Sequence, residues 1–89
     1  MYKLLIVEDD FIIAKGLQKH FEKYHYDVQY IEDFEHVLDE FLKFQPDLVL
    51  LDIHLPFFDG YYWCQEIRKI SQVPIVFISS ANENMNIVL

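Results

Sequence analysis

The stretch from residue 48 to residue 60 reads Leu-Val-Leu-Leu-Asp-Ile-His-Leu-Pro-Phe-Phe-Asp-Gly, and it decides the fold. Its first four residues are apolar without a break, which is typical of a strand buried on both faces of a sheet. The strand ends at Asp52, and the residues from 53 to 58 form a loop. Asp59 and Gly60 then open a helix. The inward face of that helix is expected to carry Trp63, Cys64 and Ile67.

Three further segments have the character of strands. Two of them, residues 4–7 and 75–78, are short apolar runs like residues 48–51, and Pro74 directly precedes the second run. Residues 27–31 alternate between polar and apolar side chains, so that strand is expected nearer an edge of the sheet.

The segments between these strands repeat their apolar residues at spacings of three and four, as helices do. Asp10 is placed to cap a helix that runs to about Tyr24, and Asp33 is placed to cap a second. The second helix ends at Gln45 and Pro46. Its inward stripe is expected to contain Phe34, Val37, Leu38 and Phe41. Residues 84–89 are predicted to be the first turns of a fourth helix.

Strict alternation of strands and helices predicts an α/β fold. In such folds a parallel sheet is covered by helices on both faces, which gives three layers in the order αβα. A chain of 89 residues is the size of one domain, so we assign residues 1–89 to a single domain.

The composition narrows the class of protein. The hydrophobic content of 53% supports a real core, and the net charge of -8 disfavours direct binding to nucleic acid. The single cysteine, Cys64, can form no disulfide within the chain, which fits the reducing cytoplasm. No apolar run approaches the roughly 20 residues of a membrane span, so no membrane contact is expected.

Polar side chains follow three of the predicted strands. Glu8 and Asp9 follow the first, Asp52 ends the third, and Ser79 and Ser80 follow the fourth. Ligands of open parallel sheets bind beyond the carboxyl ends of the strands. Two unit charges 4 Å apart repel by roughly 4 kcal/mol at an effective dielectric of 20, so clustered carboxylates favour a hard cation. The sequence therefore predicts a site for Mg²⁺, or Mn²⁺, at this edge.

At these residues the chain resembles the receiver (CheY-like) domain of two-component response regulators. The resemblance rests on residues 5–10, on Asp-x-x-Leu-Pro-x-x-Asp-Gly at residues 52–60, and on residues 74–80. It looks most like the OmpR/PhoB class, and within it like Gram-positive regulators that sense bacitracin and antimicrobial peptides. It implies a flavodoxin-like, doubly wound sheet with strands in the order 2-1-3-4. It also implies a cytoplasmic phosphorelay protein that regulates transcription.

The resemblance assigns a role to each site residue. Asp52 would accept a phosphoryl group from a sensor histidine kinase. Ser79 would be the hydroxyl that hydrogen-bonds the phosphoryl group, and Ser80 would be the small residue beside it. Asp9 and Asp52 would bind the metal directly. Glu8 would bind it through a water molecule, and His54 through its main-chain carbonyl.

The family pattern continues for roughly 25–35 residues beyond Leu89, with a fifth strand and a fifth helix. The start of that strand carries a lysine that pairs with the phosphoryl group, and neither Lys43 nor Lys69 can replace it by spacing. We therefore expect a receiver domain that is incomplete at its C-terminus, with residues 75–78 forming an open sheet edge. Such an edge favours a homodimer or a domain-swapped oligomer. A DNA-binding domain would follow in the parent protein.

Other functions fit these residues less well. A phosphatase of the haloacid dehalogenase type needs a second aspartate two residues after the first, and position 54 is histidine. A flavodoxin-like cofactor binder needs a phosphate-binding loop after its first strand, where this chain has Glu-Asp-Asp at residues 8–10. A receiver-like interaction module that cannot be phosphorylated stays open as an alternative, and its affinity for Mg²⁺ would decide. We expect a signalling phosphoacceptor and no enzyme with an external substrate.

Overall fold

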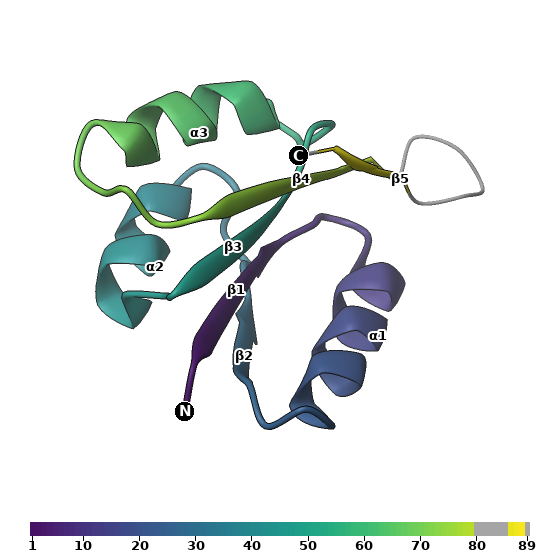
Figure 1. Cartoon of the computed structure of the whole chain (residues 1–89). Helices are drawn as coiled ribbons and strands as arrows, with labels where there is room; N and C mark the ends of the chain where they lie inside the picture. Colours follow the sequence, from purple (N-terminus) through teal and green to yellow (C-terminus); the bar gives the residue numbers. More distant parts are fainter. Residues whose placement is uncertain (80–85, 89) are drawn as a thin grey trace.

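The computed structural model describes residues 1–79 and 86–88, and strands and helices alternate along it as far as the fourth strand (Figure 1). The strands are β1 (Lys3–Val7), β2 (Asp27–Tyr30), β3 (Leu48–Asp52), β4 (Ile75–Ser79) and β5 (Asn86–Val88). The helices are α1 (Phe11–Glu22), α2 (Val37–Phe44) and α3 (Gly60–Arg68).

The sheet has the strand order β2-β1-β3-β4-β5. Its first four strands are parallel, and β5 pairs antiparallel with β4. The predicted order 2-1-3-4 is thus confirmed. The neighbouring strands β1 and β3 both have unbroken apolar runs, because both of their faces are covered.

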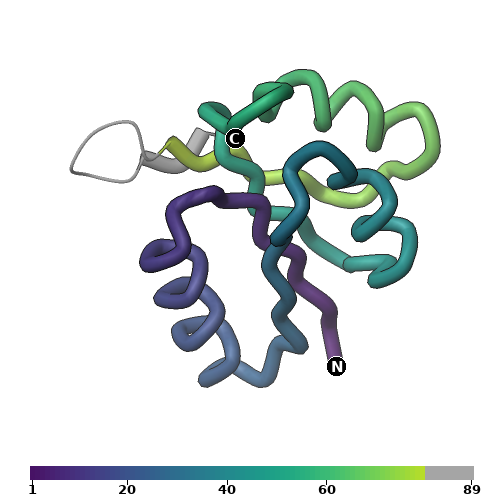
Figure 2. Tube along the Cα trace, turned by 180° about the vertical axis from the view of Figure 1, so that it is seen from behind, coloured from purple at the N-terminus to yellow at the C-terminus, as the bar shows by residue number. Residues whose placement is uncertain are grey.

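The helices lie on both faces of the sheet. Helix α1 covers one face, while α2 and α3 cover the other (Figures 1 and 2). The side chains of a strand alternate between the two faces, so each central strand supplies both cores. One core, against α1, contains Leu4, Ile6, Ala14, Val28 and Leu50. The expected three-layer αβα arrangement is therefore confirmed.

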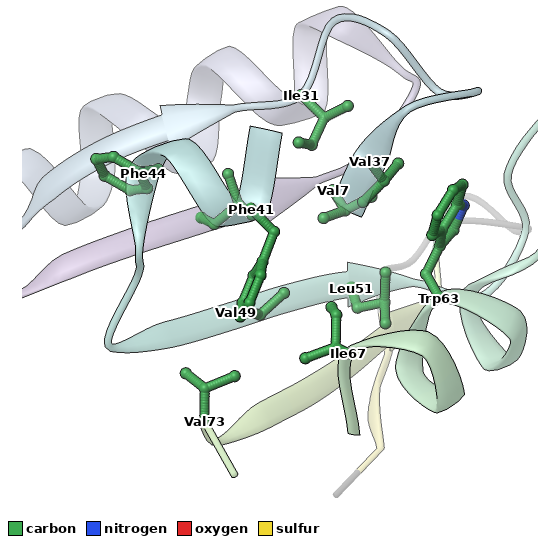
Figure 3. Close-up of a cluster of buried hydrophobic side chains, with 11 residues drawn as sticks. Val7, Ile31, Val37, Phe41, Phe44, Val49, Leu51, Trp63, Ile67 and Val73 are labelled. Atoms are coloured by element: carbon green, nitrogen blue, oxygen red, sulfur yellow. The ribbon is translucent and has the colours of Figure 1, made fainter. Parts of the chain in front are cut away.

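The larger core joins α2 and α3 to the opposite face of the sheet (Figure 3). Its strand residues include Leu5, Val7, Val49 and Leu51, and its helix residues include Val37, Phe41, Trp63 and Ile67. Full burial of each such side chain stabilises the fold by roughly 1.5–3 kcal/mol. The predicted inward face of α3 is confirmed, with Cys64 half-buried and packed against this core.

Two helix boundaries differ from the expectation. Helix α1 ends at Glu22, two residues before Tyr24, and the chain turns through the left-handed residue His25. Helix α2 begins at Val37, so the prediction that Asp33 caps it was wrong. The side chain of Asp33 accepts a hydrogen bond from the main-chain N of Glu35 and so stabilises a turn ahead of the helix. The predicted end of α2 is correct, because its C-cap residue Gln45 has a left-handed φ of 51°.

The prediction of a fourth helix over residues 84–89 was wrong for residues 86–88, which form β5. The remaining residues of that prediction lie outside the described part of the chain. A β4 without a neighbour would present a row of unpaired main-chain donors and acceptors, and β5 pairs with them. The β-branched residues Ile87 and Val88 also favour a strand. β5 thus covers the edge of β4 from Phe77 to Ser79. The association of two copies through the rest of this edge stays a prediction.

Candidate functional site

The carboxyl ends of β1 and β3 bring three carboxylates together. These strands are neighbours in parallel register, with Val7 opposite Leu51. The next residues along the two strands, Glu8 and Asp52, therefore leave the sheet side by side. One carboxylate oxygen from each of Glu8, Asp9 and Asp52 lies within 4.8 Å of the other two. The juxtaposition expected from the strand ends is present.

The three carboxylates differ in exposure. Asp52 is completely buried, Glu8 is 2% exposed, and Asp9 is exposed to solvent. Main-chain donors hold the two buried groups: the N–H of His54 donates to Oδ1 of Asp52 at 3.2 Å, and the N–H of Asp10 donates to Oε2 of Glu8 at 3.0 Å. The site is therefore a buried pair of acids with a third at its mouth.

This donor set suits a hard divalent cation. Two full charges 4.8 Å apart repel by roughly 3.5 kcal/mol at an effective dielectric of 20, and a cation between them removes that cost. The ligand atoms are all oxygens, as Mg²⁺ and Mn²⁺ prefer, and Cys64 lies elsewhere, in α3. No other group of three or more such side chains within residues 1–79 and 86–88 comes this close together.

Asp10 takes the role of a helix cap. Its Oδ1 accepts hydrogen bonds from the main-chain N of Ile12 at 3.0 Å and of Ile13 at 3.3 Å. Its carboxylate is thereby directed at the first turn of α1, where it also interacts favourably with the helix dipole. This agrees with the predicted cap.

Gly60 shapes the loop that follows Asp52. Its N–H donates to the main-chain O of Ile53 at 2.8 Å. A Cβ atom at position 60 would overlap the main-chain O of Asp52 and lie 3.0 Å from the Cα of Ile53. Only glycine therefore allows α3 to begin so close to Asp52. The Asp-Gly pair at residues 59–60 predicts a helix start, but no local pattern in the sequence reveals this close approach.

Two of the other predicted site residues lie at the same edge. Asp52 pairs with Ile78 of β4, so Ser79 is one residue beyond that pair, half-buried at the end of its strand. The side chain of His54 is exposed, as expected, and the role of its carbonyl stays a prediction. Ser80 lies outside the described residues.

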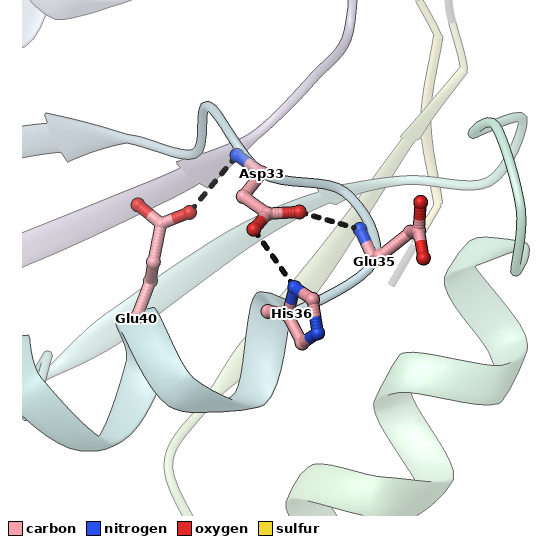
Figure 4. A network of polar contacts seen from close by, with 4 residues as sticks. All are labelled: Asp33, Glu35, His36 and Glu40. Carbon is pink, nitrogen blue, oxygen red and sulfur yellow. Dashed lines mark hydrogen bonds and ion pairs between the residues drawn. The ribbon is translucent and has the colours of Figure 1, made fainter.

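The ionisable groups with shifted pKa values lie away from this site. Asp33 and His36 are exposed in the β2–α2 connection, with Oδ2 and Nδ1 2.8 Å apart (Figure 4). That hydrogen bond lowers the pKa of Asp33 and raises the pKa of His36. On α3, Lys69 binds Glu66 at 2.7 Å, which raises the pKa of the lysine. Lys69 is thus committed to its own helix, as its spacing implied.

A family model described as the response regulator receiver domain matches residues 4–89. The chain belongs to this family. It is a receiver domain of the two-component response regulators, as the resemblance indicated.

Individual relatives agree with this assignment. The chain is 52% identical over 89 residues to the transcriptional regulatory protein YvcP of Bacillus subtilis (strain 168), of which it covers 38%. The N-terminal domain of the nisin resistance regulator NsrR, described as a lantibiotic response regulator, matches with 45% identity and a TM-score of 0.84, over 97% of this chain and 73% of that one.

A third match is a response regulator in a complex. The structure is that of the response regulator protein TrrA in complex with the histidine kinase ThkA. The match has 29% sequence identity and a TM-score of 0.81, over 92% of this chain and 72% of that one. None of the helices in the described part of this chain has the length and apolar content that a membrane span requires.

Proposed function

We propose that Asp52 accepts a phosphoryl group from a histidine of a sensor kinase. The observation that carries this proposal is the fully buried carboxylate at the end of β3, within 4.8 Å of Glu8 and Asp9. A carboxylate in this position is a nucleophile with a metal-binding pair beside it. The pairing of TrrA with a histidine kinase supports the class of partner.

The proposed transfer forms one bond and breaks one. An oxygen of Asp52 attacks the phosphorus, the phosphorus–nitrogen bond of the donor histidine breaks, and the released imidazole keeps the electron pair and takes a proton. The chain contributes mainly by positioning and charge neutralisation, as in phosphoryl transfer generally. The His54 N–H donates to Oδ1 of Asp52 and so helps to fix the orientation of the carboxylate.

The proposed ligands of Mg²⁺ are Asp9 and Asp52 directly, Glu8 through a water molecule, and the main-chain carbonyl of His54. When bound, the metal would neutralise the carboxylates and the oxygens of the phosphoryl group. Mn²⁺ would bind the same oxygen donors.

Ser79 is proposed as the hydroxyl that donates a hydrogen bond to the phosphoryl group, and Ser80 as the main-chain N–H donor beside it. The support for Ser79 is its place at the end of β4, one residue beyond the Asp52–Ile78 pair. The proposal for Ser80 rests on the resemblance alone. Residues 1–89 are proposed as one receiver domain.

The chain spans about two fifths of the length of the curated relatives that it matches. Because those relatives are transcriptional regulators, we propose that this domain controls a DNA-binding domain in a cytoplasmic regulator. A net charge of -8 makes the receiver itself a poor partner for DNA. It acts as a signalling phosphoacceptor that catalyses only its own phosphorylation and dephosphorylation.

The test is to incubate the chain with Mg²⁺ and acetyl phosphate and to measure its intact mass. We expect the mass of one phosphoryl group to be added, and the addition to disappear in Asp52→Asn or without the metal. Asp27→Asn, which removes an exposed carboxylate at the start of β2, is the matched control and should be phosphorylated normally. A folded chain that gains no phosphoryl group would sink the proposal and favour the interaction module.

A further inference from the structure

The loop after β3 and the first turn of α3 expose four aromatic side chains. Phe57 is 70% exposed, Phe58 41%, Tyr61 54% and Tyr62 38%. We call these four residues the aromatic surface. Large apolar groups normally contribute to a core, so a group of four at one place on the exterior calls for an explanation.

Three of the four rings of the aromatic surface, those of Phe58, Tyr61 and Tyr62, are held by contacts with other rings. Phe58 stacks on Tyr62 with centroids 4.3 Å apart, and both meet the buried ring of Trp63 edge-on at 5.5 and 5.0 Å. Tyr61 contacts Phe77 of β4 at 5.3 Å. A surface fixed in this way loses little side-chain entropy when a partner binds.

Within the aromatic surface, Phe57 has the most exposed ring and the least favourable backbone. Its φ is 67°, in the left-handed region that disfavours residues with a Cβ. Nothing is gained from burial in return, because most of the ring faces solvent. Strained positions of this kind cluster at functional sites, where the strain presents a group to a ligand.

The aromatic surface adjoins the proposed acceptor. The same loop holds Asp52 through the His54 N–H and ends at Gly60, against the main chain of Asp52. Asp52 is completely buried, so a protein that brings a histidine to it must cover the loop around its opening. The aromatic surface therefore lies where the phosphodonor has to sit.

The area of the aromatic surface indicates a transient contact. Its exposed rings amount to on the order of 400 Å² if each ring carries about 200 Å² when free. That is roughly half of one side of a standard interface, which suits a short-lived signalling contact. It is too small for a stable dimer of this chain held by these residues alone.

Charge points to the same role. The edge around the acceptor carries Glu8, Asp9, Asp10 and Asp59, and the chain as a whole has a charge of -8. A phosphorylated histidine is also anionic, so long-range attraction between the donor and this acidic chain is weak, although a bound Mg²⁺ would offset the charge beside Asp52. Apolar contact has to supply the affinity, and rigid exposed aromatic rings supply it efficiently.

We propose that the aromatic surface docks the protein that donates the phosphoryl group, with Phe57 as its central contact. This inference rests on the proposed function and adds the surface that recognises the donor. If the inference is right, a change in the aromatic surface slows phosphorylation by a kinase and leaves phosphorylation by a small donor such as acetyl phosphate unchanged.

The experiment compares two donors on one variant. Phe57→Asn removes the ring and keeps a residue that tolerates a left-handed φ. Its rate is measured with acetyl phosphate and with whichever phosphorylated histidine kinase of the encoding organism phosphorylates the unaltered chain fastest. Leu42→Asn, which removes another half-exposed apolar side chain on α2, is the matched control. Trp63 fluorescence checks that the ring cluster of Phe58, Tyr62 and Trp63 is unchanged.

We expect kcat/KM for transfer from the kinase to fall about 10–100-fold relative to the acetyl phosphate rate in Phe57→Asn, and to stay level in Leu42→Asn. An equal fall with both donors would overturn the inference, because the loop would then shape only the acceptor. An unchanged kcat/KM with the kinase would also overturn the inference. So would sedimentation showing that the unaltered chain is a dimer that Phe57→Asn dissociates.

The two proposals can fail separately. If acetyl phosphate phosphorylates the chain and no kinase does, the docking inference is wrong and the acceptor chemistry stands. If acetyl phosphate fails, the proposed function fails.

Discussion

Two acidic clusters in this chain use the same kinds of side chain in opposite ways. Glu8, Asp9 and Asp52 come from two strands and surround a buried position. Asp33 and Glu40, by contrast, lie within one connection and the helix after it, where Asp33 binds His36 and Glu40 accepts from the N–H of Asp33 (Figure 4). The first cluster has two buried acids held by main-chain donors, and the second is open to water.

The difference in burial between the two clusters explains why only the first one is suited to bind a metal ion. Charges in water are screened and interact weakly, whereas charges at the edge of a buried sheet interact strongly. The sheet forces the first cluster together, and local turns assemble the second at little cost. Changes near Asp52 should therefore have large effects on stability and metal binding, while changes near Asp33 should have small ones.

The largest effect is expected from Gly60→Ala. The new Cβ would overlap the main-chain O of Asp52, so the loop must shift, and we expect a loss of about 2–3 kcal/mol in the free energy of unfolding. Urea denaturation measures it. Gly16→Ala is the matched control, because no atom lies within 4 Å of the added Cβ, and there we expect a gain of about 0.5–1 kcal/mol. Equal effects at the two glycines would contradict the close approach at Gly60.

The next effect is the stabilisation by Mg²⁺. At a metal concentration ten times its Kd, binding to the folded chain should add about 1.4 kcal/mol to the free energy of unfolding. Asp9→Asn should remove most of this increment, whereas Asp33→Asn should leave it unchanged, since Asp33 belongs to the exposed cluster. Urea denaturation with and without Mg²⁺ gives the increment for each variant. An increment lost equally in both variants would mean that the metal acts through general charge screening.

A smaller gain in stability is expected from a change at Phe57. Replacing it with glycine relieves the left-handed strain, and with 70% of the ring exposed little packing is lost. We expect a net gain of roughly 0.5–1 kcal/mol after the greater freedom of the unfolded chain is subtracted. His25, exposed and also with a φ of 67°, is the matched site for the same change. If Phe57→Gly lowers the urea midpoint while His25→Gly raises it, the Phe57 ring stabilises the fold by packing.

The smallest effect is expected at His36, in the exposed cluster. Its pKa is raised above the ordinary value of 6.5 by the hydrogen bond that its Nδ1–H donates to Asp33, so the ion pair stabilises the folded chain below pH 6.5. The contribution is lost as the pH rises through the raised pKa. At the acid end, the pKa of Asp33 is lowered below 3.8, so the contribution is lost again as the pH falls through that lowered pKa.

His36→Gln should therefore lower the urea midpoint slightly at pH 5.5 and hardly at all at pH 8.5. The effect is small because both groups are exposed to solvent. His25→Gln serves as the control for losing an exposed histidine. A midpoint difference that is larger at pH 8.5 than at pH 5.5 would refute the assigned ion pair.

Much of the fold followed from local patterns. The unbroken apolar runs predicted the central strands, because a strand covered on both faces needs apolar residues at every position. Asp10 was correctly predicted as a cap, since capping involves only the next three residues. Asp33 was wrongly predicted as one, because the same side chain can stabilise a turn just as well.

The candidate site was predicted in part for a geometric reason. Parallel strands end at the same edge, so the residues after β1 and at the end of β3 had to be near one another, although 44 positions separate Glu8 from Asp52. The prediction for residues 86–88 failed for the opposite reason. Whether that segment becomes helix or strand depends on the vacant edge of β4, which no local pattern describes.

The sequence by itself determined the alternation of strands and helices, the family, and the strand ends that carry Glu8, Asp9 and Asp52, because each depends on neighbours in the chain or on a motif. Only the tertiary structure decided the closeness of Gly60 to Asp52, the left-handed backbone of Phe57 and the pairing of β5 with β4. These depend on how main-chain atoms from distant segments meet, and a list of side chains does not contain that information.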